Sequence, residues 1–377
     1  MRILLAPDSF KGTLSAKEVC AILTEAFGAV DSSYILRSCP VADGGEGLCA
    51  ALEQTLGGTA VQTETQGPFG EAMMAEYLLL EDQTAVIEMA ACAGLPLAGE
   101  RKNPELASTY GVGLLLRHAE ALGAKKILLG LGGSATNDCG LGMAAALGYR
   151  FLDASGAELP PNGMSMARVT AIRRTERPFS LPVTAACDVD NPLYGPQGAA
   201  YVFAAQKGAD AAMVRRLDEG LRNMARVIQA ELGQAVAELP GAGAAGGLGA
   251  AVAAFLGGTL RPGIDIVLDA VRLDTLLEET DLVLTGEGKL DTQSLHGKVI
   301  SGVAERARRK GAPVVLLCGC MEGELADFLA RGIQHVYTCG VPGRSMEELQ
   351  KYCRAELYTA AQRVARELKA EGAWSQP

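Results

Sequence analysis

The sequence has 377 residues, of which 49% are hydrophobic, and its formal net charge at pH 7 is −10. This negative charge argues against nucleic acid or an anionic membrane as a partner, and the length exceeds what one hydrophobic core usually organises, so we expect two domains. The 10 cysteines have no zinc-site spacing, and the closest pair is Cys318 and Cys320, which favours reduced thiols in a cytoplasmic protein.

The N-terminal residues predict a strand, a loop and a helix. Residues 2–6 form an apolar strand, and Ser15 with Glu18 forms a capping box ahead of a helical apolar repeat. The sequence shows no signal-peptide pattern at this end, and no apolar run reaches the ~20 residues of a membrane span. Residues 8–12 are expected between the carboxyl end of this strand and the start of this helix, which is where open α/β sheets bind ligands. Lys11 could meet a phosphate or carboxylate group there, although a solvated lysine in a turn would give the same pattern.

Strand-like and helical segments alternate along the whole chain, which predicts the α/β class. The N- and C-terminal parts share one style, and the middle differs. We expect residues 1–65 with 285–377 to form one discontinuous domain, and residues 66–284 to form an inserted second domain. Within the inserted part, the expected strands are AVIEMA, KKILLGL, VTAACDV and AAYVFAAQ.

The loop at residues 42–47 combines adjacent glycines with carboxylates. Asp43 and Glu46 flank Gly44 and Gly45, so the backbone would let a ligand come close to two acidic side chains. This pattern suits a cation or a sugar-like hydroxyl group. An acidic first turn of a helix would look the same, and both interpretations stay open on these residues alone.

Residues 127–140, ILLGLGGSATNDCG, contain the spacing G-x-G-x-x-A, and Asp153 follows about twenty residues later. Formally this is a dinucleotide-binding fingerprint, which would indicate an NAD-dependent hydroxyacid dehydrogenase. The fingerprint does not require Asn137 and Asp138, whereas a metal–phosphate site could use them. The backbone amides that could bind an anion belong to Gly132, Gly133 and Ser134.

Two further loops carry acidic residues after expected strands. Asp188 and Asp190 would point to opposite faces of an extended segment, so only a turn would bring them together. The sequence Asn191-Pro192 favours such a turn. The loop at residues 285–298 contains acids, glycines and a lysine but does not match a Walker sequence.

Together these five loops provide lysines, carboxylates and glycine amides, but no serine or thiol nucleophile in a recognisable setting. Phosphoryl transfer requires this mixture, because its catalysis is mainly positioning and charge neutralisation. The residues alone therefore predict a phosphate-handling enzyme. An NAD-dependent hydroxyacid dehydrogenase and a non-catalytic nucleotide- or carboxylate-binding sensor are the alternatives.

Seven blocks in order resemble the bacterial glycerate kinase family, the type I glycerate 2-kinases. They are APDSFKG (6–12), ADGGEG (42–47), GLGGSATND (130–138), CDVDNPL (187–193), GAAGGLG (243–249), PGIDIVLD (262–269) and TGEGKLDTQSLHGK (285–298). The resemblance covers residues 1–370. It implies two three-layer α/β domains, a discontinuous Rossmann-like one and an inserted flavodoxin-like one, with the site in the cleft between them. It also implies phosphorylation of D-glycerate by ATP with Mg²⁺, with 2-phosphoglycerate favoured over 3-phosphoglycerate as the product.

With this resemblance, the loops suggest roles for single residues. Lys11 is expected to bind the carboxylate of glycerate, and Asp188 to orient the attacking hydroxyl group or accept its proton. Further substrate contacts are expected from Asp8, Ser9, Asp43, Gly44, Gly45, Glu46, Asn137 and Asn191. Phosphate contacts are expected from Gly132, Gly133, Ser134, Gly286, Gly288, Ser294 and Lys298, and Mg²⁺ ligands from Asp190, Glu287 and Asp291.

Two positions depart from the family pattern. Cys139 stands where the family's loop usually has a glycine after Asn-Asp, and residues 109–116 lack the threonine and glutamate of a G-T-G-E-L pattern. Neither departure affects the lysine or the acidic loops. The oligomeric state stays open, with a homodimer as one alternative.

Overall fold

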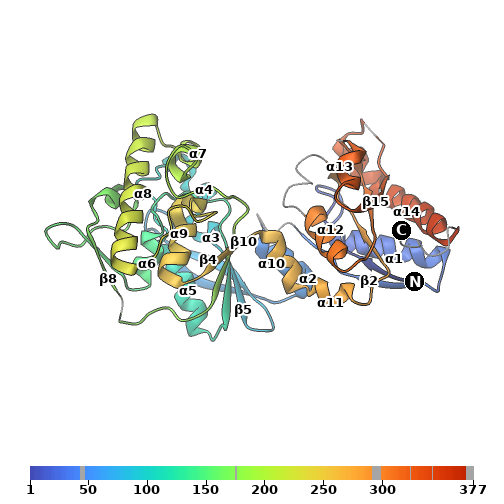
Figure 1. Cartoon of the computed structure of the whole chain (residues 1–377), viewed down its shortest axis with the longest axis horizontal. Helices are drawn as coiled ribbons and strands as arrows, with labels where there is room; N and C mark the ends of the chain where they lie inside the picture. The colour runs from blue at the N-terminus through green and yellow to red at the C-terminus, as the bar shows by residue number, and fades with distance from the viewer. Residues whose placement is uncertain (43–46, 175, 291–298, 323, 342, 371–377) are drawn as a thin grey trace. The chain divides into compact units, whose positions relative to one another are not determined.

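The structure is a computed structural model that describes residues 1–42, 47–174, 176–290, 299–322, 324–341 and 343–370. The chain divides into two compact units. Unit 1 consists of Met1–Gly44, Ala50–Leu56 and Ile264–Pro377, and unit 2 of Gly45–Cys49 and Gly57–Gly263. In Figure 1 the blue N-terminal and red C-terminal segments belong to the same unit, and the green and yellow middle of the chain forms the other.

Unit 1 is built on a parallel sheet of five short strands. Their order is β15 (Ile333–Thr338), β13 (Val314–Cys318), β11 (Leu282–Thr285), β1 (Arg2–Leu5) and β2 (Ile35–Ser38). Counted along this unit, the order is 2-1-3-4-5, the flavodoxin-type arrangement, whose ligands bind outside the carboxyl ends of the strands at the switch point. That switch point lies between β1 and β11. The resemblance had implied a Rossmann-like sheet for this unit and a flavodoxin-like one for the other.

Two helices of unit 1 that come from opposite ends of the sequence pack against each other. Helix α1 (Ala16–Val30) packs beside α14 (Met346–Ala370), and the hydroxyl of Tyr34 donates to the carbonyl of Ala365 over 3.1 Å. The predicted capping box at Ser15 and Glu18 is present in full. The other elements are α2 (Leu48–Leu56), α10 (Gly263–Ala270), α11 (Leu273–Leu277), β12 (Lys289–Leu290), α12 (Val299–Arg309), β14 (Cys320–Met321) and α13 (Leu325–Leu329).

Unit 2 contains a mixed sheet of six strands. Their order is β10 (Thr259–Arg261), β9 (Val183–Ala186), β6 (Lys126–Gly130), β5 (Thr84–Glu88), β4 (Ala72–Leu79) and β3 (Thr59–Gln66). The first four strands run parallel to one another. Strand β4 runs antiparallel to β5, and β3 runs antiparallel to β4. The carboxyl ends of β5, β6 and β9 therefore meet at one edge, which carries two of the predicted loops, those after β6 and β9.

Helices and small elements complete unit 2 around a large apolar core. They are α3 (Ala90–Ala93), α4 (Leu95–Ala98), η1 (Gly99–Arg101), α5 (Tyr110–Ala121), α6 (Leu141–Ala146), β7 (Arg150–Leu152), η2 (Gly163–Arg168), β8 (Ala171–Arg173), α7 (Ala199–Phe203), η3 (Ala205–Lys207), α8 (Ala211–Leu232) and α9 (Ala244–Leu256). The expected strand AAYVFAAQ is wrong, because this segment forms α7 and η3; its alanines favour a helix.

The α/β class predicted from the sequence is confirmed, and the unit boundaries differ from the expected ones at both crossings: β3 falls in unit 2, and α10, α11 and β11 fall in unit 1. Strand β3 belongs to unit 2 because it pairs with β4 along all of its length. Helices α10 and α11 belong to unit 1, where Arg306 of α12 donates hydrogen bonds to Asp269 over 2.6 Å and to Asp274 over 3.1 Å. In the described part of the chain, no helix combines the length and apolar character needed to cross a membrane.

Candidate functional site

Backbone hydrogen bonds hold together the loops that leave the carboxyl edge of the unit 1 sheet. The amide of Asp8 donates to the carbonyl of Gly286 over 2.8 Å, and the amide of Gly340 donates to the carbonyl of Gly319 over 2.8 Å. Glycine is required at residue 286, because a Cβ atom there would lie 1.9 Å from the carbonyl oxygen of Leu317. The loops after β1, β11, β13 and β15 therefore form one packed surface at the switch point.

A cavity of ≈ 500 Å³ lies at this edge. Its lining combines apolar side chains with three cations: Phe10, Val341, Met346, Lys11, Lys289 and Arg344. Lys289 pairs with Glu322 over 2.8 Å, and Arg344 pairs with Glu356. Among the described residues, Lys11 is the one of these cations without an ion pair, and its side chain is exposed. The cavity thus offers a positive group to an anionic ligand.

The structure brings several predicted site residues of unit 1 together. Ser9, Lys11, Glu287 and Gly288 all line the cavity. Asp8 is 6% exposed and is not among the described residues that line the cavity; its carboxylate accepts a hydrogen bond from the amide of Ser9 over 2.6 Å, which helps to fix the loop. The predicted residues Asp43, Gly44, Gly45, Glu46, Asp291, Ser294 and Lys298 lie outside the described residues.

In unit 2, the loop after β6 packs against Gly246 on one side and against Ala93 on the other. Gly246 adopts φ +68°, and a Cβ atom there would lie 2.2 Å from the carbonyl oxygen of Thr136. On the other side, the amide of Ala135 donates to the carbonyl of Ala93 over 2.9 Å. Gly133, at φ +72°, is exposed at the turn of the loop. The backbone of residues 131–140 is therefore fixed by its neighbours, while the turn at Gly133 stays accessible.

Asp138 is fully buried and has a structural environment. Its carboxylate accepts hydrogen bonds from the amide and hydroxyl groups of Thr109, both over 2.8 Å, and from the amides of Gly140 and Gly142 over 3.0 and 3.2 Å. Burial raises the pKa of this carboxyl group, although the four hydrogen bonds act in the opposite direction. Asp138 therefore holds the loop to α5 and α6, and it is not placed to bind a metal–phosphate group.

Two polar side chains of the same region remain in unusual surroundings. Asn137 is 0% exposed, yet neither its Oδ1 nor its Nδ2 atom has a hydrogen-bond partner among the described residues. Lys207 of η3 is 2% exposed, and its Nζ atom donates to the hydroxyl oxygen of Ser134 and to the carbonyl oxygen of Thr136, both over 2.8 Å. Buried polar groups are normally satisfied, so this loop holds polar groups that are ready for a further partner.

The predicted catalytic loop follows β9, the neighbour of β6. Oδ1 of Asp188 accepts a hydrogen bond from the amide of Gly263 over 2.8 Å, so this carboxylate also fixes the backbone at Gly263. Asp190 is exposed. The side-chain amide of Asn191 donates to the carbonyl of Gln197 over 2.8 Å, which closes its own loop. Asn191 therefore has a structural contact that the sequence did not reveal.

In the structure, Asp153, the acidic residue of the dinucleotide fingerprint, follows a strand that is not part of the sheet carrying the glycine-rich loop. Strand β7 pairs with β8 in a separate two-stranded sheet, not in the six-stranded sheet that contains β6. Asp153 follows β7 and accepts hydrogen bonds from the amides of Ser155 and Ala157 within a turn. In a dinucleotide-binding fold, that acidic residue belongs to the same βαβ unit as the glycine-rich turn. The arrangement required for an NAD site is absent from the described residues.

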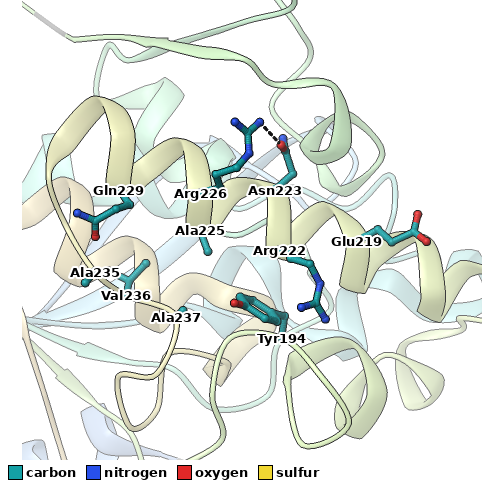
Figure 2. Close-up of a pocket in the computed structure, with 10 residues that line it drawn as sticks. All are labelled: Tyr194, Glu219, Arg222, Asn223, Ala225, Arg226, Gln229, Ala235, Val236 and Ala237. Atoms are coloured by element: carbon teal, nitrogen blue, oxygen red, sulfur yellow. Dashed lines mark hydrogen bonds between the residues drawn. The ribbon is translucent and has the colours of Figure 1, made fainter.

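Another cavity, of ≈ 670 Å³, lies along α8 in unit 2 (Figure 2). The guanidinium carbon of Arg222 lies 4.3 Å from the ring centroid of Tyr194, and Arg226 donates to the side-chain oxygen of Asn223 over 2.9 Å. None of the predicted site residues is among the described residues that line it.

The described residues contain no group of three or more histidine, cysteine or acidic side chains that could hold a metal ion. Mg²⁺ usually keeps several waters and binds through one or two carboxylates with substrate phosphates. The half-buried Glu287 at the cavity and the exposed Asp190 have suitable oxygen atoms.

Three residues of interest were missed from the sequence. Lys207 stands in a short 3₁₀ segment with no motif around it, and Arg344 follows β15 in a loop that had no prediction. Glu88, at the end of β5, accepts a hydrogen bond from the amide of Gly47 over 2.9 Å. An acidic residue at the carboxyl end of a buried strand could have indicated Glu88; no signal could have indicated the other two.

Comparison with known proteins places the whole chain in one family. The model of the glycerate kinase family matches residues 3–369. Glycerate kinase of Bacillus cereus is 40% identical over 97% of this chain and 97% of its own length, and glycerate 2-kinase of Escherichia coli K12 is 40% identical over 96% and 97%. A crystal structure assigned as glycerate kinase 2 of Salmonella typhimurium LT2 superimposes with a TM-score of 0.87 and 39% identity, over 98% of this chain and 99% of that one. The chain belongs to the glycerate kinase family.

Proposed function

We propose that this chain transfers the γ-phosphoryl group of ATP to D-glycerate, at the hydroxyl group of carbon 2. The family match over residues 3–369 carries this proposal. The choice of carbon 2 is supported by the name of the Escherichia coli relative, a glycerate 2-kinase that is 40% identical. The cavity with an exposed, unpaired Lys11 at the switch point of unit 1 supports a small anionic substrate or a phosphate group.

In unit 1, Lys11 binds the carboxylate of glycerate. A charged hydrogen bond from an ammonium to a carboxylate is roughly twice as strong as a neutral one. Ser9 adds a hydroxyl group to the same cavity. Gly288 also lines it, and phosphate contacts from Gly286 and Gly288 remain part of this proposal. Substrate contacts from residues 43–46 and phosphate contacts from Ser294 and Lys298 remain part of this proposal.

The candidate ligands for Mg²⁺ are the carboxylates of Glu287 and Asp291 in unit 1 and of Asp190 in unit 2. When bound, Mg²⁺ would neutralise part of the charge on the phosphate oxygens. Glu287 is half-buried and lines the same cavity as the exposed Lys11.

In unit 2, the amides of Gly132, Gly133 and Ser134 bind phosphate oxygens. The fixed backbone of this loop suits that role, since positioned amides lose little freedom when an oxyanion binds. Asp188 orients the attacking hydroxyl group or accepts its proton, and the unpartnered amide of Asn137 is assigned to substrate. Asn191 keeps its assignment to substrate, although its side chain already bonds Gln197.

The test is a coupled ADP-release assay with a panel of small hydroxyacids, in which NMR of the product identifies the phosphorylated carbon. We expect ADP release with D-glycerate and formation of 2-phosphoglycerate. NAD(H) absorbance is followed in parallel, because the dehydrogenase alternative requires a change there. Ligand binding without ADP release would support the sensor alternative and contradict the proposal.

A further inference from the structure

Lys207 places an amino group behind the loop that follows β6. Its side chain is 2% exposed, and its Nζ atom has two acceptors at 2.8 Å, the hydroxyl oxygen of Ser134 and the carbonyl oxygen of Thr136. Lysine is almost never fully buried without a partner. Here the partners are two neutral oxygens, not a carboxylate, so the positive charge has no direct ion pair among the described residues.

Ser134 connects this amino group to the accessible side of the loop. Its hydroxyl oxygen accepts the hydrogen bond from Lys207, which leaves the hydroxyl proton available for another acceptor. The neighbouring Gly133 is exposed, and the loop backbone is fixed by the contacts of Ala135 and Gly246. Ser134 itself is 9% exposed, so its hydroxyl group lies between the buried amino group of Lys207 and the exposed backbone of Gly133.

No acidic side chain is in direct contact with the Lys207 ammonium among the described residues. The nearby carboxylate is that of Asp138, whose hydrogen bonds go to Thr109, Gly140 and Gly142. On the surrounding elements, Lys102 is exposed, Glu105 pairs with Arg216, and Asp210 caps α8. Burial lowers the pKa of the Lys207 ammonium to about 7, although the charge of Asp138 raises it.

We propose that Lys207 is a positioning residue for phosphate binding: a phosphate group at the amides of Gly132, Gly133 and Ser134 is stabilised by the Lys207 ammonium acting through Ser134, and the ligand binds together with a proton on Lys207. The inference rests on the proposed function, which assigns phosphate to this loop. Its physical basis is that Lys207 has no direct ion-pair partner among the described residues, since a nearby anion favours the protonated form of an amine. By linkage, protonation then favours the anion to the same extent.

The experiment measures MgATP binding to the full chain by titration calorimetry, without glycerate, in two buffers of equal pH and different ionisation enthalpy. The difference in heat gives the number of protons taken up. At pH 8 we expect uptake of more than about half a proton per ATP, and an affinity that falls by up to roughly tenfold per pH unit above neutrality.

Three variants separate the charge from the packing. Lys207→Met keeps the length of the side chain and removes the charge, so we expect no proton uptake and roughly 10- to 100-fold weaker binding at pH 7. Lys207→Arg keeps a permanent charge, so binding should become independent of pH without proton uptake. Ser134→Ala removes the connection and should weaken binding while the protein stays folded.

Lys125→Met is the matched control, because Lys125 is an exposed lysine in the same unit. It should bind like the original protein and keep the proton uptake. The inference is overturned if Lys207→Met retains the uptake and affinity of the original protein, or if a folded Lys207→Arg variant retains the pH dependence. Such a result would leave glycerate phosphorylation intact, whereas loss of the proposed function would show as no ADP release by the unaltered protein.

Discussion

The hydroxyl group of Thr109 donates a hydrogen bond to Oδ2 of Asp138 over 2.8 Å and accepts one from the amide of Met143 over 2.9 Å. Thr109 is the residue before α5, and Asp138 precedes α6, so this pair joins the first turns of two helices that pack together. The loop that carries Ser134 and Asn137 is anchored by this contact. Its polar motif, Asn137-Asp138, thus divides into an unpartnered amide and a fully bonded carboxylate.

Replacement of this carboxylate should destabilise unit 2. Asp138→Asn leaves one accepting oxygen and turns an NH₂ group toward amide donors, so we expect a loss of about 2–4 kcal/mol in the free energy of unfolding. Denaturant unfolding measures the change. Asp153→Asn, in a partly exposed turn, is the control and should change stability by less than about 1 kcal/mol. Normal stability of Asp138→Asn would contradict the structural role.

Lys11→Ala tests the cation at the unit 1 cavity. If Lys11 binds the carboxylate of glycerate, loss of a charged hydrogen bond should lower kcat/KM for glycerate by roughly 10- to 200-fold, mainly through KM. Because Lys11 is exposed, the melting temperature should not change. Lys17→Ala removes an exposed lysine from α1 and should be silent in both measurements. Near-normal turnover with a normal KM in Lys11→Ala would remove its assigned role.

Asp188 combines a proposed catalytic role with a structural one, and two substitutions separate them. Asp188→Asn retains an oxygen for the amide of Gly263, so thermal stability should stay near normal while kcat falls by about 100-fold or more. Asp188→Ala loses the acceptor as well and should also lower the melting temperature. Equal kcat values for Asp188→Asn and the unaltered protein would show that the carboxylate has no part in the reaction.

Gly246 supports the loop after β6 by its missing side chain. Gly246→Ala would place a Cβ atom 2.2 Å from the carbonyl oxygen of Thr136 at φ +68°. The matched control is Gly257→Ala, at φ +60° with nothing within 4 Å of the added atom, so it carries the backbone strain without the collision. We expect Gly246→Ala to cost at least about 2 kcal/mol more than the control in unfolding experiments. Similar losses would show that the loop tolerates the shift.

Local sequence patterns predicted the parts of this fold that depend on neighbouring residues. The Ser15–Glu18 capping box and the strand predicted at residues 2–6 follow from short-range rules, and the structure contains the capping box and a strand at Arg2–Leu5. The predicted loop position of Lys11 places it in the lining of a cavity. The G-x-G-x-x-A spacing after Gly130 is also real. Whether this spacing indicates a dinucleotide site depends on where Asp153 lies. Spacing alone cannot predict that β7, the strand before Asp153, pairs with β8 in a separate sheet.

Long-range contacts explain what the sequence could not reveal. Lys207 meets Ser134, which lies 73 residues earlier, and Asp188 meets Gly263, which lies 75 residues later. Neither residue type nor spacing distinguishes a buried lysine from a solvated one in a short 3₁₀ segment. The predicted unit boundaries differ from the observed ones for the same reason. The unit to which β3 and α10 belong depends on the distant segments that they contact, β4 and α12, and not on the composition of β3 and α10 themselves.

The buried amine also predicts how stability depends on pH. Burial lowers the pKa of Lys207 to about 7 from its ordinary value of 10.5, so between these values the unfolded chain binds more protons than the native one. The contribution of this group to the free energy of unfolding must therefore increase as the pH rises from 7 toward 10.5. Below pH 7 the native state carries the full cost of burying the charged ammonium group. Denaturant unfolding of the unaltered protein and of Lys207→Met at several pH values isolates this contribution, because other titrating groups are shared. We expect the stability of Lys207→Met relative to the unaltered protein to fall as the pH rises through this range, and a constant difference would exclude the shift.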